Sequence, residues 1–105
     1  MVFVETIIFS KLLAGYLDDD EYRRLQVALM LRPEQGPVIR GSGGLRKVRW
    51  AKAGGGKRGG VRVIYYWLPA DQVFYMLYVF SKNEQGDLTP NQIRTLGRLV
   101  REEFK

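Results

Sequence analysis

Basic side chains gather in one short part of this sequence, the 23 residues from Arg40 to Arg62. Like charges at this density repel one another, so a polyanion is the simplest partner for the stretch. Arginine suits phosphate because its planar guanidinium offers two parallel donors. The stretch therefore predicts phosphate contact, with a solvated, flexible basic loop as the alternative. It contains eight lysines and arginines and no acidic residue: Arg40, Arg46, Lys47, Arg49, Lys52, Lys57, Arg58 and Arg62.

The residue types missing from the sequence limit the chemistry that remains. The chain of 105 residues contains no histidine and no cysteine. Histidine is the commonest general base near neutral pH and the commonest transition-metal ligand, and cysteine supplies thiolates, disulfides and zinc ligands. Any catalysis must therefore use Tyr, Lys, Arg, Glu, Asp, Ser or Thr. We expect no metal site and no cofactor.

The clearest strand in the sequence runs from Val61 to Leu68 and carries one charged residue, Arg62. Alternation with a period of two puts Arg62 on the same face as Ile64 and Tyr66. The strand is apolar almost throughout, which indicates a central strand that is covered on both faces. An arginine there needs a partner or contact with water, since an unpaired buried charge is costly. Arg62 is therefore the strongest single functional candidate, with a structural ion pair as the alternative.

A second predicted strand, over residues 45–51, is basic along one face. Alternation sends Lys47 and Arg49 to that face and Arg46 to the other. The glycine-rich loop that follows formally matches the pattern G-x-G-x-x-G. The dinucleotide fingerprint requires a helix after this pattern, and here a strand follows, so we reject that interpretation. Lys57 and Arg58 near the tip of the loop favour phosphate contact instead.

Hydrophobic spacing and helix caps predict the elements that position these residues. A short strand over residues 2–4 precedes a helix over residues 6–16 and a second helix that ends before Pro33. The acidic run Asp18–Glu21 is assigned to the start of that second helix rather than to a metal site. Strands follow over residues 45–51, 61–68 and 73–80, and a capping box formed by Thr89 and Gln92 begins the last helix.

The order β-α-α-β-β-β-α indicates an α+β fold: a small antiparallel sheet with an N-terminal helical hairpin and a C-terminal helix. The length suits one hydrophobic core and no linker divides the chain, so we expect a single domain over residues 1–105. The apolar start lacks a basic region and is broken by Glu5, and no apolar run reaches the roughly 18 residues that span a bilayer. We expect a cytoplasmic protein without a membrane partner.

Three segments of the sequence together resemble a known family. They are residues 40–49, 57–66 and 81–84, with the sequences RGSGGLRKVR, KRGGVRVIYY and SKNE. In this order and spacing the whole chain resembles the RelE/ParE superfamily of toxin–antitoxin toxins, in particular its HigB-type branch. The resemblance implies a RelE-like fold.

The resemblance also implies a function. Such a toxin is a metal-independent endonuclease that cuts messenger RNA in the ribosomal A site and thereby inhibits translation and growth. A cognate antitoxin, usually a helix-turn-helix protein that binds operator DNA, masks its active site. The implied partners are therefore the antitoxin, the ribosome and messenger RNA, and DNA only indirectly through the antitoxin complex.

The family's catalytic residues correspond to four positions of this sequence. The basic strand supplies Lys47 and Arg49, and the next strand supplies Arg62. The Gly-Lys-Arg pattern after the last long strand is Ser-Lys-Asn here, so that Lys82 is kept and Asn83 replaces an arginine.

A nuclease of this kind can use the 2′-hydroxyl of the RNA as nucleophile, so the protein must supply positioning, positive charge at the phosphate and proton transfers. Arg49 and Arg62 are expected to stabilise the pentavalent phosphate. Lys47 or Lys82 is expected to transfer protons, because crowding by cations disfavours the charged form of a lysine. Contacts with the RNA backbone are expected from Arg40, Arg46, Lys57, Arg58 and Asn83.

Two other functions remain open. A ParE-like toxin poisons DNA gyrase without cutting RNA, although the basic cluster on two strands favours the nuclease. A non-catalytic RNA- or ribosome-binding module would bind with a steep salt dependence and give no cleavage products.

Overall fold

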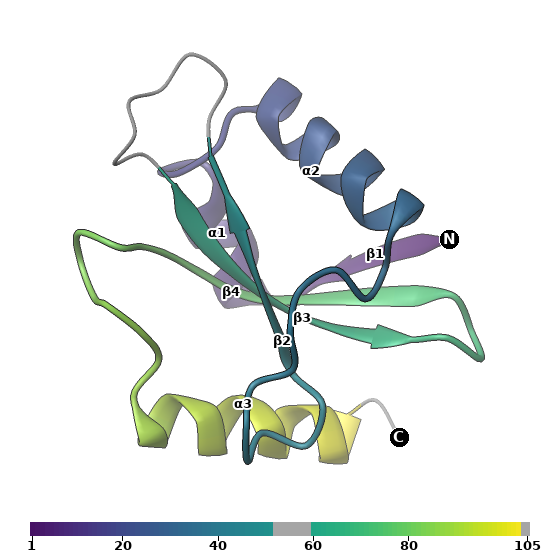
Figure 1. Ribbon diagram of the computed structural model, residues 1–105, viewed down its shortest axis with the longest axis vertical. Helices are drawn as coiled ribbons and strands as arrows, with labels where there is room; N and C mark the ends of the chain where they lie inside the picture. Colours follow the sequence, from purple (N-terminus) through teal and green to yellow (C-terminus); the bar gives the residue numbers. More distant parts are fainter. Residues whose placement is uncertain (52–59, 104–105) are drawn as a thin grey trace.

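The computed structural model describes residues 1–51 and 60–103 of the chain. These residues form three helices and a four-stranded sheet with the strand order β1-β4-β3-β2 (Figure 1). The α+β class and the predicted order of elements are confirmed, and no described helix is both long and apolar enough to cross a membrane. The elements are β1 (Val2–Glu5), α1 (Ile7–Leu13), α2 (Asp19–Leu31), β2 (Arg46–Trp50), β3 (Val61–Leu68), β4 (Val73–Ser81) and α3 (Pro90–Glu103).

The two long apolar strands, β3 and β4, lie at the centre of the sheet, as predicted. The β2–β3 and β3–β4 pairs are antiparallel, whereas β1 pairs with β4 in parallel. The sheet is therefore mixed, and the expectation of a wholly antiparallel sheet was wrong for its first strand. A short connection imposes antiparallel pairing, but β1 meets β4 only after two helices and two strands, so the local sequence does not determine their direction.

Helices lie on both sides of the sheet, with α1 and α2 on one side and α3 on the other (Figure 1). A hydrophobic core fills the space on each face. On one face, α1 and α2 bury Phe9, Leu25 and Leu29; on the other, α3 buries Leu96 and Val100. We call these the α1–α2 face and the α3 face. Burying a side chain of this size contributes about 1.5–3 kcal/mol. Packing on both faces holds β3, and with it Arg62, in a fixed position.

A bulge in β4 interrupts its alternation. Ile64 of β3 pairs with Tyr78, but the next residue, Tyr65, pairs with Met76, so that Leu77 is skipped in the register. Leu77 and Tyr78 consequently both pack on the α3 face. The bulge shifts by one position which side chains of β4 face each side, while burial on both faces explains why the sequence of β4 is apolar almost throughout.

Both predicted capping boxes begin helices. The Asp18 carboxylate accepts a hydrogen bond of 2.8 Å from the backbone of Glu21, and Thr89 and Gln92 exchange bonds of 3.1 and 2.9 Å. The acidic run Asp18–Glu21 thus serves the start of α2. In the part of the chain that the structure describes, no group of His, Cys, Asp and Glu residues could hold a metal ion.

The first helix is shorter than predicted and ends at Leu13 rather than at Tyr16. The backbone nitrogen of Gly15 donates to Leu12, and that of Tyr16 donates to Leu13, at 3.0 and 2.9 Å. These bonds span three residues instead of four, so the chain tightens and leaves the helix. The spacing of apolar residues continues through this turn, so the pattern alone overestimates the length of the first helix.

The buried tyrosine Tyr65 connects β3 to the loop that follows α2. Its hydroxyl donates to the carbonyl of Pro33 at 2.7 Å and accepts from the backbone nitrogen of Gly36 at 3.1 Å. Burial raises the pKa of this hydroxyl, so it stays protonated and able to donate. The loop is thereby held against the sheet.

Replacing Tyr65 with phenylalanine should lower the free energy of unfolding by about 1–3 kcal/mol, because the Gly36 nitrogen loses its buried acceptor. Urea denaturation measures this as a lower midpoint with an unchanged slope. Tyr66→Phe is the matched control, since Tyr66 lies on the other face of the same strand and is half-buried. A Tyr65→Phe midpoint equal to that of the wild type would contradict the anchoring role.

Candidate active site

A cleft of about 410 Å³ opens beside the basic face of β2. Its lining comes from the loop of residues 35–37, from β2 and the start of β3, and from Gly86 in the loop between β4 and α3. Three of the four predicted catalytic residues meet there. The lining residues are Gln35, Gly36, Pro37, Lys47, Val48, Arg49, Arg62 and Gly86.

The register of the sheet brings these cations together. Arg49 of β2 lies directly opposite Arg62 of β3, and Lys47 lies opposite Ile64. Directly opposed side chains stand about 4.5–5.5 Å apart at their β-carbons, and like charges so placed destabilise a sheet. The grouping of Lys47 with Arg49 on one face of β2 is as predicted, and the structure places that face on the α3 side together with Arg62. An arrangement that is unfavourable in the free protein becomes favourable when an anion lies between the two guanidinium groups.

The two arginines have no direct acidic contact in the described part of the protein, although Arg62 helps to lower the pKa of Asp87 from a greater distance. Within residues 1–51 and 60–103, neither Arg49 nor Arg62 forms an ion pair or a side-chain hydrogen bond. Arg49 is exposed and Arg62 half-buried, so both groups face water in the cleft. Of the two explanations for an arginine in a central strand, the structure favours the wet site over the ion pair.

Lys47 differs from the two arginines because it has an acidic partner. Its ammonium donates to Oδ1 of Asp87 at 2.9 Å. Lys47 is the main cause that holds the pKa of Asp87 below its usual range, and Arg62 adds to the effect. Asp87 is not among the residues that the sequence predicts for the site. The two partners lie 40 positions apart, and only the folded chain brings them together.

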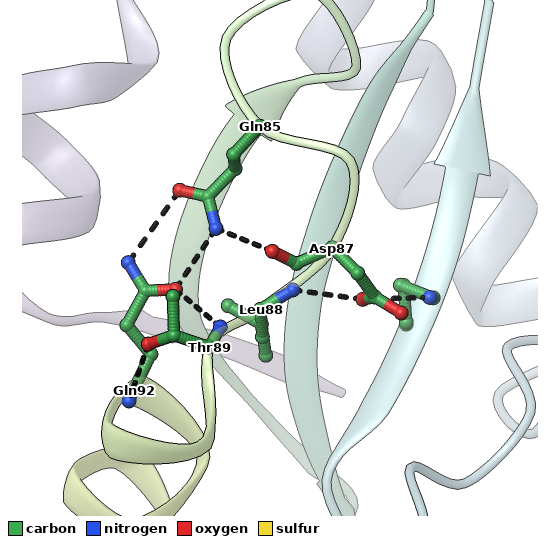
Figure 2. A network of polar contacts seen from close by, with 6 residues as sticks. Gln85, Asp87, Leu88, Thr89 and Gln92 are labelled. Atoms are coloured by element: carbon green, nitrogen blue, oxygen red, sulfur yellow. Dashed lines mark hydrogen bonds and ion pairs between the residues drawn. The ribbon is translucent and has the colours of Figure 1, made fainter.

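A network of polar contacts holds the segment that carries Asp87 (Figure 2). Oδ1 of Asp87 also accepts from the backbone nitrogen of Leu88 at 2.8 Å. The Gln85 amide donates to the carbonyl of Asp87 at 2.6 Å and to the side chain of Gln92 at 2.9 Å. The loop between β4 and α3 is therefore tied both to the start of α3 and to β2.

A second contact fixes the same loop nearer to β4. The hydroxyl of Tyr16 donates to the carboxylate of Glu84, which also accepts from the Ser81 hydroxyl at 3.2 Å. This hydrogen bond raises the pKa of Tyr16 to about 12 and lowers the pKa of Glu84. At neutral pH, Tyr16 is therefore protonated and Glu84 is ionised, which is the combination that the bond requires.

The other predicted residues lie outside the lining of the cleft. Arg46 points to the α1–α2 face, where its guanidinium donates to the carbonyls of Glu34 and Gly36 at 3.1 and 2.8 Å and so supports the loop of residues 35–37. Lys82 and Asn83 are exposed in the turn after β4. Their assigned roles, and that of Arg46, stay predictions.

Three further residues predicted to contact RNA complete the set. Arg40 is exposed in the turn before β2, and the neighbouring Ser42 carbonyl lies against Gly97 of α3. Lys57 and Arg58 lie outside the described residues. The contribution of all three to RNA binding stays a prediction.

Comparison with known proteins places this chain in a family. The model of the family described as "RelE toxin of RelE / RelB toxin-antitoxin system" matches residues 32–104. Among solved structures, the chain is similar to an arginine-to-alanine double mutant of E. coli toxin RelE in the free state, with 13% sequence identity and a TM-score of 0.54. The similarity covers 92% of this chain and 93% of that one, and at this identity it shows the shared fold. The chain therefore belongs to the family of RelE toxins of toxin–antitoxin systems.

Proposed function

We propose that this toxin is a single-domain, metal-independent endoribonuclease that cuts messenger RNA in the ribosomal A site and so inhibits translation and growth. The observation that carries the proposal is the cleft in which Arg49 and Arg62 face each other with Lys47 beside them. Charge of this kind suits the phosphate of an RNA backbone, and neither arginine forms an ion pair among the described residues.

In the proposed reaction the 2′-oxygen attacks the adjacent phosphorus atom. The bond from phosphorus to the 5′-oxygen breaks, and a 2′,3′-cyclic phosphate remains on the upstream fragment. Arg49 and Arg62 stabilise the additional negative charge on the pentavalent phosphate. Lys47 and Lys82 are the candidates for taking the proton from the 2′-hydroxyl and for giving one to the 5′-oxygen.

The proposed partners follow from the family. A cognate antitoxin covers the cleft until it is removed, and the toxin contacts DNA only through that complex. In this proposal the ribosome helps to hold the messenger in line for attack. We place the protein in the cytoplasm, where these partners are found, and in the HigB-type branch of the superfamily.

Induced expression in growing cells, combined with mapping of messenger ends, tests this proposal. We expect growth arrest and new 5′-ends inside translated reading frames, which disappear when translation initiation is blocked. A gyrase supercoiling assay on the purified protein should show no inhibition. Growth arrest with gyrase inhibition and intact messengers would instead support the ParE-like function. Ribosome binding without new messenger ends would support a non-catalytic module.

A further inference from the structure

Asp87 is an acidic group in contact with the cationic cleft, and the proposed chemistry does not use it. Its Oδ1 atom receives both Lys47 Nζ at 2.9 Å and the Leu88 nitrogen at 2.8 Å. The side chain of Lys47 is 31% exposed and that of Asp87 63%, so the pair lies at the solvent-facing edge of the cleft. Oδ1 of Asp87 thus accepts from β2 and from its own loop at the same time. This contact restricts where the Lys47 ammonium can lie.

The support behind Asp87 is unusually complete for an exposed residue. Its backbone carbonyl accepts from Gln85, and Gln92 accepts from the nitrogen of Thr89, so the residues on both sides are held (Figure 2). The next residue, Leu88, is buried in the core of the α3 face. The carboxylate is thus mounted on a fixed backbone, as expected of a group that positions another.

The charge of Asp87 argues against its acting as the base. A general base works best when its pKa is near the working pH, and the pKa of Asp87 is held below the ordinary carboxylate range by Lys47. The geometry of the contact argues against Lys47 as the base as well. Its Nζ donates to Oδ1 of Asp87 at 2.9 Å, so the lysine is engaged with the protein and not with the 2′-hydroxyl.

We propose that Asp87 is a positioning residue that fixes the ammonium of Lys47 at the edge of the cleft and commits Lys47 to stabilising the charge on the scissile phosphate. The inference rests on the proposed function and deepens it. Of the two lysines considered for proton transfer, it removes Lys47 and leaves Lys82.

Asp87→Asn tests the assignment, because the amide oxygen can still accept from Leu88 while the charge is lost. Asp71→Asn is the matched control, since Asp71 is exposed in the turn between β3 and β4. For Asp87→Asn we expect kcat to fall about tenfold, as displaced charge costs up to a hundredfold. KM should be unchanged or lower, because removing a negative charge favours RNA binding. Asp87→Glu should recover part of kcat.

The lysine ammonium signals in the NMR spectrum of the RNA-free protein give a second readout that does not depend on cleavage. We expect a Lys47 signal, identified by its absence in Lys47→Arg, in the wild type and in Asp71→Asn but not in Asp87→Asn. Unchanged kcat with lower KM in Asp87→Asn would overturn the assignment, as would a retained Lys47 signal. If the wild type cuts no RNA, the proposed function fails, and the role of Asp87 in cleavage fails with it. Loss of the signal in Asp87→Asn would then still confirm that Asp87 holds Lys47.

Discussion

Replacing Arg62 with alanine should slow RNA cleavage by about a hundredfold to a thousandfold, the cost of removing one donor that stabilises charge in a transition state. The half-buried guanidinium lines the cleft on a central strand and has no ion pair among the described residues. The cleavage rate of Arg62→Lys should lie between the rates of the wild type and Arg62→Ala, because an ammonium keeps the charge but loses the planar pair of donors.

Single-turnover cleavage of ribosome-bound messenger measures this effect without a contribution from product release. Arg23→Ala is the control, because Arg23 is an exposed residue of α2 that pairs with Asp20 and lies outside the cleft. Its rate should equal that of the wild type. A folded Arg62→Ala protein that cuts at the wild-type rate would remove Arg62 from the site.

The pair formed by Arg49 and Arg62 should behave as one unit. We expect Arg49→Ala to slow cleavage by about a hundredfold and the double variant to be little slower than Arg62→Ala, because the two guanidinium groups bind one phosphate. Each single substitution should also raise the free energy of unfolding by about 0.2–1 kcal/mol, since it removes a like charge from the opposite strand.

A double-mutant cycle of single-turnover rates, together with urea denaturation of the same four proteins, measures both effects. Greater stability with lower activity is expected where a fold tolerates strain for the sake of a site. If the rate reductions of the two single variants multiply in the double variant, as they do for independent residues, the arginines do not share a phosphate. Lower stability of both single variants would show that the two charges have structural partners.

Much of the site could be predicted because it depends on alternation along two strands. A period of two places Lys47 and Arg49 on one face of β2 and Arg62 on one face of β3, and the register sets Arg49 against Arg62. The helix caps at Asp18 and Thr89 are equally local, and they too are where the sequence predicts them. Strand faces and helix caps depend mainly on residues that are close in the sequence, so the sequence predicts them.

Apart from the local turn that ends α1 at Leu13, the parts that could not be predicted depend on contacts between distant segments. Nothing near Asp87 in the sequence indicates that it meets Lys47, and nothing near Arg46 indicates that its guanidinium supports the loop after α2. The parallel pairing of β1 with β4 and the bulge at Leu77 have the same origin. The sequence thus predicts the cations, whereas the fold determines which of them line the cleft and which have internal partners.

The most direct test of the central claim uses a ribosome-bound messenger in which the nucleotide before the scissile phosphate is a single 2′-deoxynucleotide. The otherwise identical all-ribose messenger is the reference, and both are incubated with the wild-type toxin and analysed by primer extension. We predict one cut in the A-site codon of the all-ribose messenger, with a 2′,3′-cyclic phosphate on the upstream fragment, and none in the deoxy-substituted one. Cleavage of both messengers, or of neither, would contradict the claim that the 2′-hydroxyl of the RNA is the nucleophile in a cleft lined by arginines.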